Sequence, residues 1–190
     1  QPAVRFRVMT GGREILNLPA VSDSRQRIGV LLGGDFSDHM VSLQGTHGEM
    51  RIEGHCSQPA LTRSGARQLF FYVNRRYIRD ALLSHAVMTA YRQLIPARRF
   101  PAAALFLEIP SGDVDVNVHP AKMEVRFRHP REVYELVAGS LGRALSGRST
   151  VAGLSDIDTS HGAAINYAGR MEEALKRYTL QTGSGKLPFD

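Results

Sequence analysis

The sequence predicts an α+β domain in which a mixed sheet is covered by helices mainly on one face. Short runs of alternating or continuously apolar residues, typical of strands, recur over the first 127 residues. Two longer segments, residues 80–94 and 130–145, carry apolar side chains at helical spacing and lie between or after strands. Apolar residues make up 43% of the chain, enough for an ordinary core. We expect the domain to span residues 1–146.

The first 34 residues predict a hairpin followed by a short helix. Residues 4–9 alternate apolar with basic side chains, which indicates a strand with one basic face. Gly11 and Gly12 favour a turn, and residues 14–17 form the returning strand. Residues 22–24 offer helix caps, and Gly33 and Gly34 end the helix.

A second hairpin is expected over residues 40–44 and 49–56, and residues 57–67 read as a loop. Residues 69–73 form a dense apolar run, which favours a central strand buried on both faces. The helix over residues 80–94 ends before Pro96.

Residues 102–109 predict another buried strand, and the following turn leads into residues 113–118, which alternate cleanly. A short strand is expected over residues 124–127. The last helix of the domain covers residues 130–145, with a proline at its first position, where a missing N–H is tolerated.

The remaining residues, 147–190, predict a linker and one helix. Residues 146–162 are rich in glycine and serine, the composition of a linker. Residues 167–180 could form an amphipathic helix, which would need a surface on which to dock.

The charge of the chain favours polyanionic partners. Its net charge is +6, dominated by arginine, and such a balance suits DNA, RNA or nucleotides as well as a merely solvated surface.

The single cysteine, Cys56, excludes an internal disulfide and is expected to be a core thiol. No membrane span or secretory signal is visible. Because the chain opens with Gln1, we interpret it as a fragment or a processed product.

Residues 113–122, Asp-Val-Asp-Val-Asn-Val-His-Pro-Ala-Lys, are the most informative segment. A strand with carboxylates and an amide on one face breaks at His119-Pro120, where proline stiffens the backbone. Lys122 follows on a short connection, from which its ammonium group could reach an anionic ligand such as phosphate. Alternatively, the acidic residues are a solvated strand face and Lys122 is an ordinary surface lysine. Asp-x-Asp is too common to indicate a metal site.

Two segments resemble one protein family. Residues 71–80, FYVNRRYIRD, resemble the F-V-N-x-R-x-[VI]-[RK]-D segment of the MutL, MLH and PMS proteins. Residues 113–127, DVDVNVHPAKMEVRF, resemble that family's VDVNVHPTK-x-EVRF signature. The two motifs occur in the family's order, which makes the resemblance specific. It covers residues 1–146, and the tail resembles nothing that we recognise.

The resemblance implies a ribosomal protein S5 domain 2-like fold that follows a GHKL-type ATPase domain. It implies that Lys122 reaches the γ-phosphate of ATP in that preceding domain, on a loop shaped by Asn117, His119 and Pro120. ATP and magnesium would be bound mainly by the preceding domain. The chain carries no GHKL motif and no D-Q-H-A-type endonuclease motif. We therefore expect no catalytic residues in this chain, which should be inactive alone, within an intact protein that is an ATPase.

The resemblance also implies a DNA-binding surface. Arg75, Arg76 and Arg79 follow a central strand, and Arg98 and Arg99 follow the next helix. Such arginines would contact phosphates without reading sequence. Alternatively, Arg79 and the adjacent Asp80 form an ion pair and a helix cap. Expected partners are DNA (mismatch-containing or nonspecific, duplex or single strand), a second copy or a paralogue, and mismatch-repair proteins such as MutS. The expected location is the bacterial cytoplasm and nucleoid or a eukaryotic nucleus.

Two other functions share parts of this pattern. A plain RNA-binding module of the same fold would suit the basic charge but would not need the His-Pro-Ala-Lys string. The matching domain of another GHKL machine, such as a type II topoisomerase, uses a different lysine motif. The string over residues 116–122 therefore favours the mismatch-repair reading.

Overall fold

The computed structural model describes residues 2–116, 125–147 and 172–176. The chain divides into two compact units, residues 1–40 and 41–190. Unit 1 contains β1 (Phe6–Thr10), β2 (Arg13–Leu18), α1 (Ser24–Leu32) and α2 (Gly34–Asp38). Unit 2 holds the large sheet and the two longest helices, so the candidate functional residues beyond residue 40 all belong to it.

Unit 1 is built on an amphipathic hairpin. β1 and β2 pair antiparallel, with Phe6 opposite Leu18 and Val8 opposite Leu16, so these apolar side chains share one face. The hairpin is joined to α1 through Arg27, whose guanidinium Nη2 donates to the carbonyl oxygens of Pro2 and Val4. The predicted hairpin is confirmed, and its returning strand begins at Arg13.

Unit 2 is organised around a five-stranded sheet in the order β3-β4-β7-β5-β6. Its strands are β3 (Met40–His47), β4 (Met50–Ser57), β5 (Leu69–Val73), β6 (Arg76–Ile78) and β7 (Ala103–Glu108). β7 pairs antiparallel with β4 and parallel with β5, which makes the sheet mixed. A separate two-stranded sheet consists of β8 (Val114–Asp115) and β9 (Arg126–Phe127).

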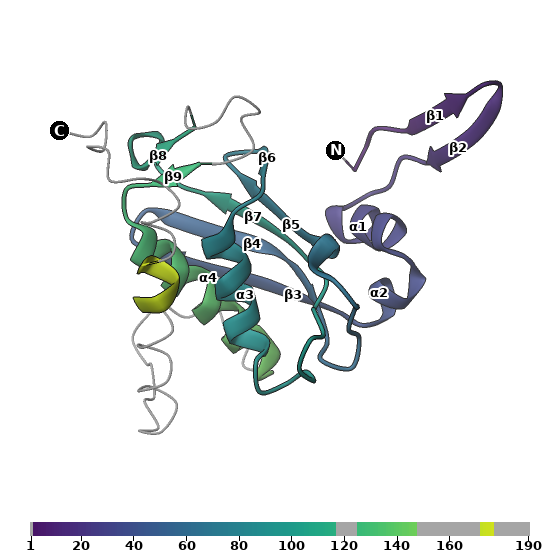
Figure 1. Cartoon of the computed structure of the whole chain (residues 1–190). Helices are drawn as coiled ribbons and strands as arrows, with labels where there is room; N and C mark the ends of the chain where they lie inside the picture. The colour runs from purple at the N-terminus through teal and green to yellow at the C-terminus, as the bar shows by residue number, and fades with distance from the viewer. Residues whose placement is uncertain (1, 117–124, 148–171, 177–190) are drawn as a thin grey trace. The chain divides into compact units, whose positions relative to one another are not determined.

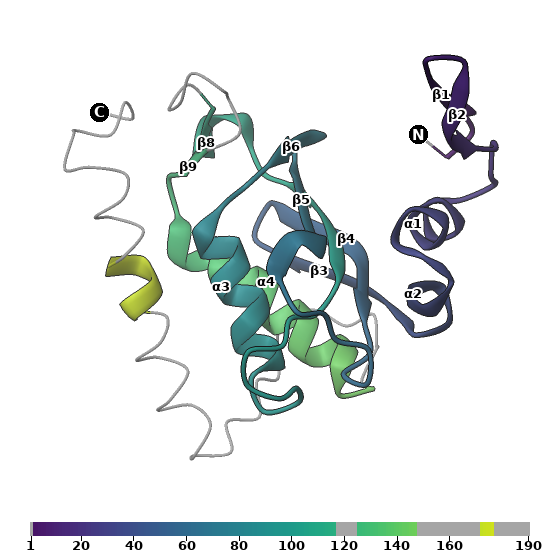
Figure 2. The same cartoon turned by 45° about the vertical axis from the view of Figure 1, so that its right-hand side comes forward.

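Both long helices, α3 (Ala81–Tyr91) and α4 (Pro130–Leu145), lie on the same face of this sheet, as Figures 1 and 2 show. Their apolar residues form one core with the side chains of the strands that point toward them. Asp80 caps α3 by accepting a hydrogen bond from the backbone N–H of Leu83 at 2.9 Å. The predicted α+β architecture, with helices mainly on one face of a mixed sheet, is confirmed.

The opposite face of the sheet carries partly exposed aromatic side chains instead of a helix of unit 2. Along β5, the buried residues Leu69, Phe71 and Val73 alternate with the partly exposed Phe70 and Tyr72. The prediction that this strand is buried on both faces is therefore wrong for one face. The reason is that α3 and α4 both lie on the other face of the sheet, so the helices of unit 2 cover β5 on one face.

A few helices and strands differ from the predicted ones in their bounds or were not predicted. The helix predicted over residues 80–94 ends at Tyr91, and β6 was not expected at all. Gly33 ends α1 as predicted, but a second short helix, α2, begins at once. Residues 172–176 are helical, and Ala174 belongs to the core; the rest of the predicted tail helix lies outside the described residues. No helix in the described ranges could cross a membrane.

Candidate functional site

The carboxyl end of the parallel pair β5 and β7 is where the candidate residues gather. The register places Val73 of β5 beside Leu107 of β7 at this end, and Leu69 beside Ala103 at the other. Beyond Val73 comes the turn with Arg75, and beyond Leu107 the chain runs through residues 109–113 into β8. Carboxyl ends of neighbouring parallel strands are a common place for ligand sites in α/β sheets.

A two-residue turn fixes the position of Arg75. Asn74 and Arg75 both have positive φ angles, 48° and 67°, the pattern of a type I′ hairpin turn. The Asn74 side chain binds the backbone of Ile109 twice: its Nδ2 donates to the carbonyl oxygen at 2.8 Å, and its Oδ1 accepts from the N–H at 3.0 Å. The turn is thereby attached to the end of β7, while the Arg75 side chain is exposed.

Two further arginines flank this turn. Arg76 opens β6 and is partly exposed, whereas Arg79 is exposed and its Nε donates to the Tyr77 hydroxyl at 3.3 Å. Within the described ranges, neither the Arg75 nor the Arg76 side chain has a hydrogen-bonding or ion-pairing partner. The helix-cap role that the sequence offered for Asp80 is observed at α3. Guanidinium groups without acidic partners can bind phosphate.

The two-stranded sheet of β8 and β9 lies on both sides, in sequence, of the segment that contains Lys122. β8 and β9 pair antiparallel, with Val114 opposite Phe127 and Asp115 opposite Arg126. The backbone N–H of Arg128 also donates to the carbonyl oxygen of Asp113 at 2.8 Å. Residues 116 and 125, the two ends of the intervening segment, are therefore held near each other. The predicted site residues Lys122, Asn117, His119 and Pro120 lie outside the described residues.

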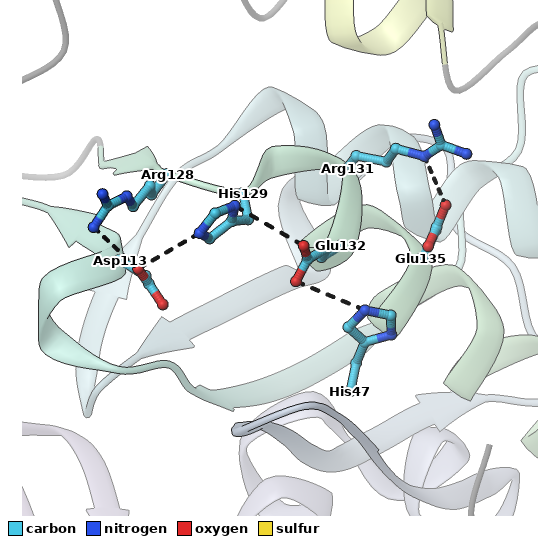
Figure 3. Close-up of polar contacts among 7 residues, drawn as sticks. All are labelled: His47, Asp113, Arg128, His129, Arg131, Glu132 and Glu135. Carbon is cyan, nitrogen blue, oxygen red and sulfur yellow. Dashed lines mark hydrogen bonds and ion pairs between the residues drawn. The ribbon is translucent and has the colours of Figure 1, made fainter. Parts of the chain in front are cut away.

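Polar contacts connect the β8–β9 pair to the rest of unit 2 (Figure 3). The Asp113 carboxylate lies 4.0 Å from the Arg128 guanidinium and 3.8 Å from His129 Nε2. His129 Nδ1 lies 3.9 Å from Glu132 on α4, whose carboxylate is 3.7 Å from His47 on β3. These contacts are longer than hydrogen bonds and partly exposed, so each contributes little alone. They form a chain of contacts from residues 113 and 128 to α4 and β3.

The other two predicted arginines lie at the opposite end of the parallel pair, before β7. Arg98 is exposed and has a positive φ of 62°. Arg99 is partly buried: its Nε donates to the Thr62 hydroxyl at 2.9 Å and its Nη2 to the Thr62 carbonyl at 3.0 Å. Five β-pairs separate the two ends. The structure therefore brings Arg75, Arg76 and Arg79 together and separates Arg98 and Arg99 from them.

Cys56 is a core thiol, as the sequence indicated. It is fully buried in β4, and burial raises the pKa of its thiol from its usual value near 9 to about 11, partly offset by a hydrogen bond with Tyr91. Burial also raises the pKa of Tyr91, whose hydroxyl donates to the carbonyl oxygen of Ser57 at 2.5 Å. A neutral, enclosed thiol of this kind is a poor nucleophile.

The sequence analysis did not identify Asn74 as the residue that anchors the turn. Nor did it predict that Asp113 contacts Arg128 and His129 beside the β8–β9 pair. Asn74 carries a usable signal, because asparagine at the start of a two-residue turn between strands favours a type I′ hairpin. Asp113 carries none, since its contacts with Arg128 and His129 depend on the pairing of β8 with β9.

Comparisons with known proteins agree on one family. Residues 28–146 match the family model described as DNA mismatch repair protein, C-terminal domain. The chain is 43% identical, over 99% of its length, to the DNA mismatch repair protein MutL of Syntrophus aciditrophicus. It is 33% identical, over 100% of its length, to the protein of that name from Mesorhizobium japonicum. It spans 32% of each of these relatives, about a third of their length.

A likeness among solved structures concerns the fold. The crystal structure of the N-terminal domain of a DNA repair protein superposes with a TM-score of 0.63 at 22% sequence identity. The match covers 77% of this chain and 49% of that one. It agrees with the α+β fold of the ribosomal protein S5 domain 2 type that the sequence implied.

Proposed function

Since the chain belongs to the MutL family of DNA mismatch-repair proteins, we propose that it couples ATP binding in a preceding GHKL domain to conformational change. Lys122 senses the γ-phosphate of ATP, on a loop shaped by Asn117, His119 and Pro120. A cation that meets only this phosphate distinguishes ATP from ADP, and such differential contact is what shifts an equilibrium between domain arrangements. ATP and magnesium are held mainly by the preceding domain.

The observation that carries this proposal is the framed segment at the carboxyl end of β5 and β7. Pairing of β8 with β9 fixes both ends of the segment that contains Lys122. Asp113 on one side contacts Arg128 and His129 on the other. When Lys122 binds phosphate, a shift of its segment would move the β8–β9 pair and, through His129 and Glu132, α4.

The partly exposed apolar face of the β1–β2 hairpin supports the proposal that another domain packs on unit 1. On the hairpin's apolar face, Phe6, Val8 and Leu16 are 43%, 42% and 40% exposed. A lone two-stranded hairpin is marginally stable in water and needs packing on a larger body. We propose that the preceding ATPase domain covers this face.

The same protein would contact DNA through Arg75, Arg76 and Arg79. Their guanidinium groups are exposed or partly exposed at one end of the sheet, and phosphate contacts of this kind do not depend on base sequence. We assign Arg99 a structural role because Thr62 engages its guanidinium. Arg98 remains a separate candidate at the other end. A second MutL copy or a paralogue, and MutS, are the proposed protein partners.

The test replaces Lys122 by alanine in the intact protein. A lost charge-assisted bond to phosphate costs about 1.5–3 kcal/mol, so we expect ATP turnover and nucleotide-driven closure to weaken about ten- to hundredfold. Turnover is measured by phosphate release, and closure by small-angle X-ray scattering with and without a non-hydrolysable ATP analogue.

Two variants serve as controls. Lys122→Arg keeps the charge and should retain part of the activity, whereas Lys176→Ala removes an exposed lysine of the tail helix and should change nothing. If Lys122→Ala turns over ATP and closes like the unmodified protein, the sensing role is wrong.

A further inference from the structure

Four aromatic side chains form a connected patch on the face of the sheet opposite α3 and α4, which we call the aromatic patch: Phe70, Tyr72, Tyr77 and Phe106. The rings of Tyr72 and Phe106 are stacked, with centroids 5.0 Å apart and planes 14° apart. Tyr77 lies 5.7 Å from Tyr72 and 6.5 Å from Phe70. The patch thus crosses three neighbouring strands, β7, β5 and β6.

These rings are not part of the core. Each is partly exposed and absent from the apolar cluster that joins the sheet to α3 and α4. Cross-strand aromatic pairs stabilise sheets, but that role does not require ring surface to remain open to solvent.

The charges around the patch differ from side to side. On the β6 side, Arg79 donates to the Tyr77 hydroxyl at 3.3 Å, and Arg75 lies in the adjoining turn. On the β4 side, the exposed Glu53 pairs in register with Phe106, and Glu108 on β7 pairs with the exposed Arg51 of β4. Because the two carboxylates on the β4 side outnumber its one guanidinium, a polyanion would be attracted more strongly on the β6 side.

We propose that the aromatic patch is a stacking surface for the unpaired bases of single-stranded DNA, whose phosphates are held by Arg75 and Arg79. Aromatic rings beside arginines bind single strands without sequence preference, because every base has a face that can stack. Paired bases in a duplex are stacked on each other and cannot use these rings. This assignment rests on the proposed DNA contact and adds to it a preference for unpaired strands.

The test compares two probes, a labelled oligo-dT and a labelled duplex of equal length, by fluorescence anisotropy on the full 190-residue chain. Tyr77→Leu and Tyr72→Leu keep apolar area but remove the ring. Loss of one base–aromatic stack costs about 1–3 kcal/mol, so oligo-dT affinity should fall about fivefold or more. Duplex affinity should change less than about twofold. Tyr72→Phe, which keeps a ring, should bind oligo-dT like the unmodified chain.

Gln44→Leu is the matched control, because Gln44 is exposed on β3 beyond the acidic side. Thermal melting of each variant verifies folding. Equal oligo-dT affinity of the unmodified, Tyr72→Leu and Tyr77→Leu chains overturns the stacking surface, as does an equal loss on both probes. The proposed DNA contact fails separately, if Arg75→Glu with Arg76→Glu leaves the affinity for both probes unchanged.

Discussion

The two ends of the parallel pair β5 and β7 both carry arginines in tight loops, yet they use them differently. Before β7, Arg99 is bonded to Thr62, and backbone bonds join Arg63 to Phe100 in both directions. After β5, the backbone is held by the Asn74 side chain, and the side chains of Arg75 and Arg76 have no partner within the described residues. The role of each arginine thus depends on which side chain holds its loop. Before β7 the Arg99 guanidinium holds the loop, whereas after β5 the Asn74 amide holds it and leaves Arg75 available for a ligand.

The largest expected effect comes from removing the amide. Asn74→Ala loses two hydrogen bonds to Ile109 and leaves in the left-handed region an alanine, which tolerates that conformation less well than asparagine. We expect a loss of about 3 kcal/mol in the free energy of unfolding, measured by urea titration. Asn74→Asp can still accept from the Ile109 N–H and should lose about half as much. A loss under about 0.5 kcal/mol for Asn74→Ala would remove the anchor role.

The amino end of the pair should respond to alkaline pH. Cys56, opposite Ala103, has its thiol pKa raised to about 11 from near 9 by burial, so the folded state favours the neutral thiol. Its contribution to stability is complete below pH 9 and is lost as pH rises toward 11, by about 2 kcal/mol.

Chemical unfolding at a series of pH values measures this loss. A Cys56→Ala variant should lose less stability over the same interval, while Tyr91, whose pKa is also raised, continues to contribute in both proteins. Parallel curves for the two proteins would show that Cys56 ionisation does not matter.

A smaller loss is expected from Arg99→Ala. Without its two hydrogen bonds to Thr62, the loop before β7 should lose about 1–2 kcal/mol of stability, seen in thermal melts. Arg98→Ala, at an exposed neighbour without a partner in the described ranges, should change stability by less than about 0.5 kcal/mol. Equal effects of the two variants would contradict the structural role of Arg99.

The smallest effect has the opposite sign. Glycine suits the left-handed conformation of residue 75, so Arg75→Gly should stabilise the chain by about 0.5–1 kcal/mol, net of the entropy that glycine loses on folding. The same variant should bind DNA more weakly. If it is both less stable and unchanged in DNA affinity, arginine is retained at this turn for packing rather than for phosphate.

Much of the fold could be predicted from local patterns. β5 and α4 have the expected bounds because one is a continuous apolar run and the other a proline-started helical period. β6 was missed because it has three residues and its turn lacks the glycine that usually marks such hairpins. The exposure of Phe70 and Tyr72 depends on what covers each face of the sheet, which no local pattern records.

The candidate site was predicted only in part, for a similar reason. The resemblance of residues 113–127 identified the segment around Lys122, and β8 and β9 occur on both sides of it. The separation of Arg75 from Arg98 follows from the parallel pairing of β5 with β7, a contact between distant parts of the chain. The resemblance and the order of the elements along the chain do not contain this contact, so they predict one surface for all five arginines.

The most direct test of whether DNA binds at the end with Arg75 and Arg76, and not at the end with Arg98 and Arg99, is the salt dependence of duplex binding by two double variants. Each phosphate contact adds about 0.9 to the slope of log K against log salt. Arg75→Glu with Arg76→Glu should therefore flatten the slope by about two contacts' worth, while Arg98→Glu with Arg99→Glu should leave it unchanged in chains that remain folded. An unchanged slope for the first pair, or a flattened slope for the second, would contradict the assignment of DNA contact to the carboxyl end of β5.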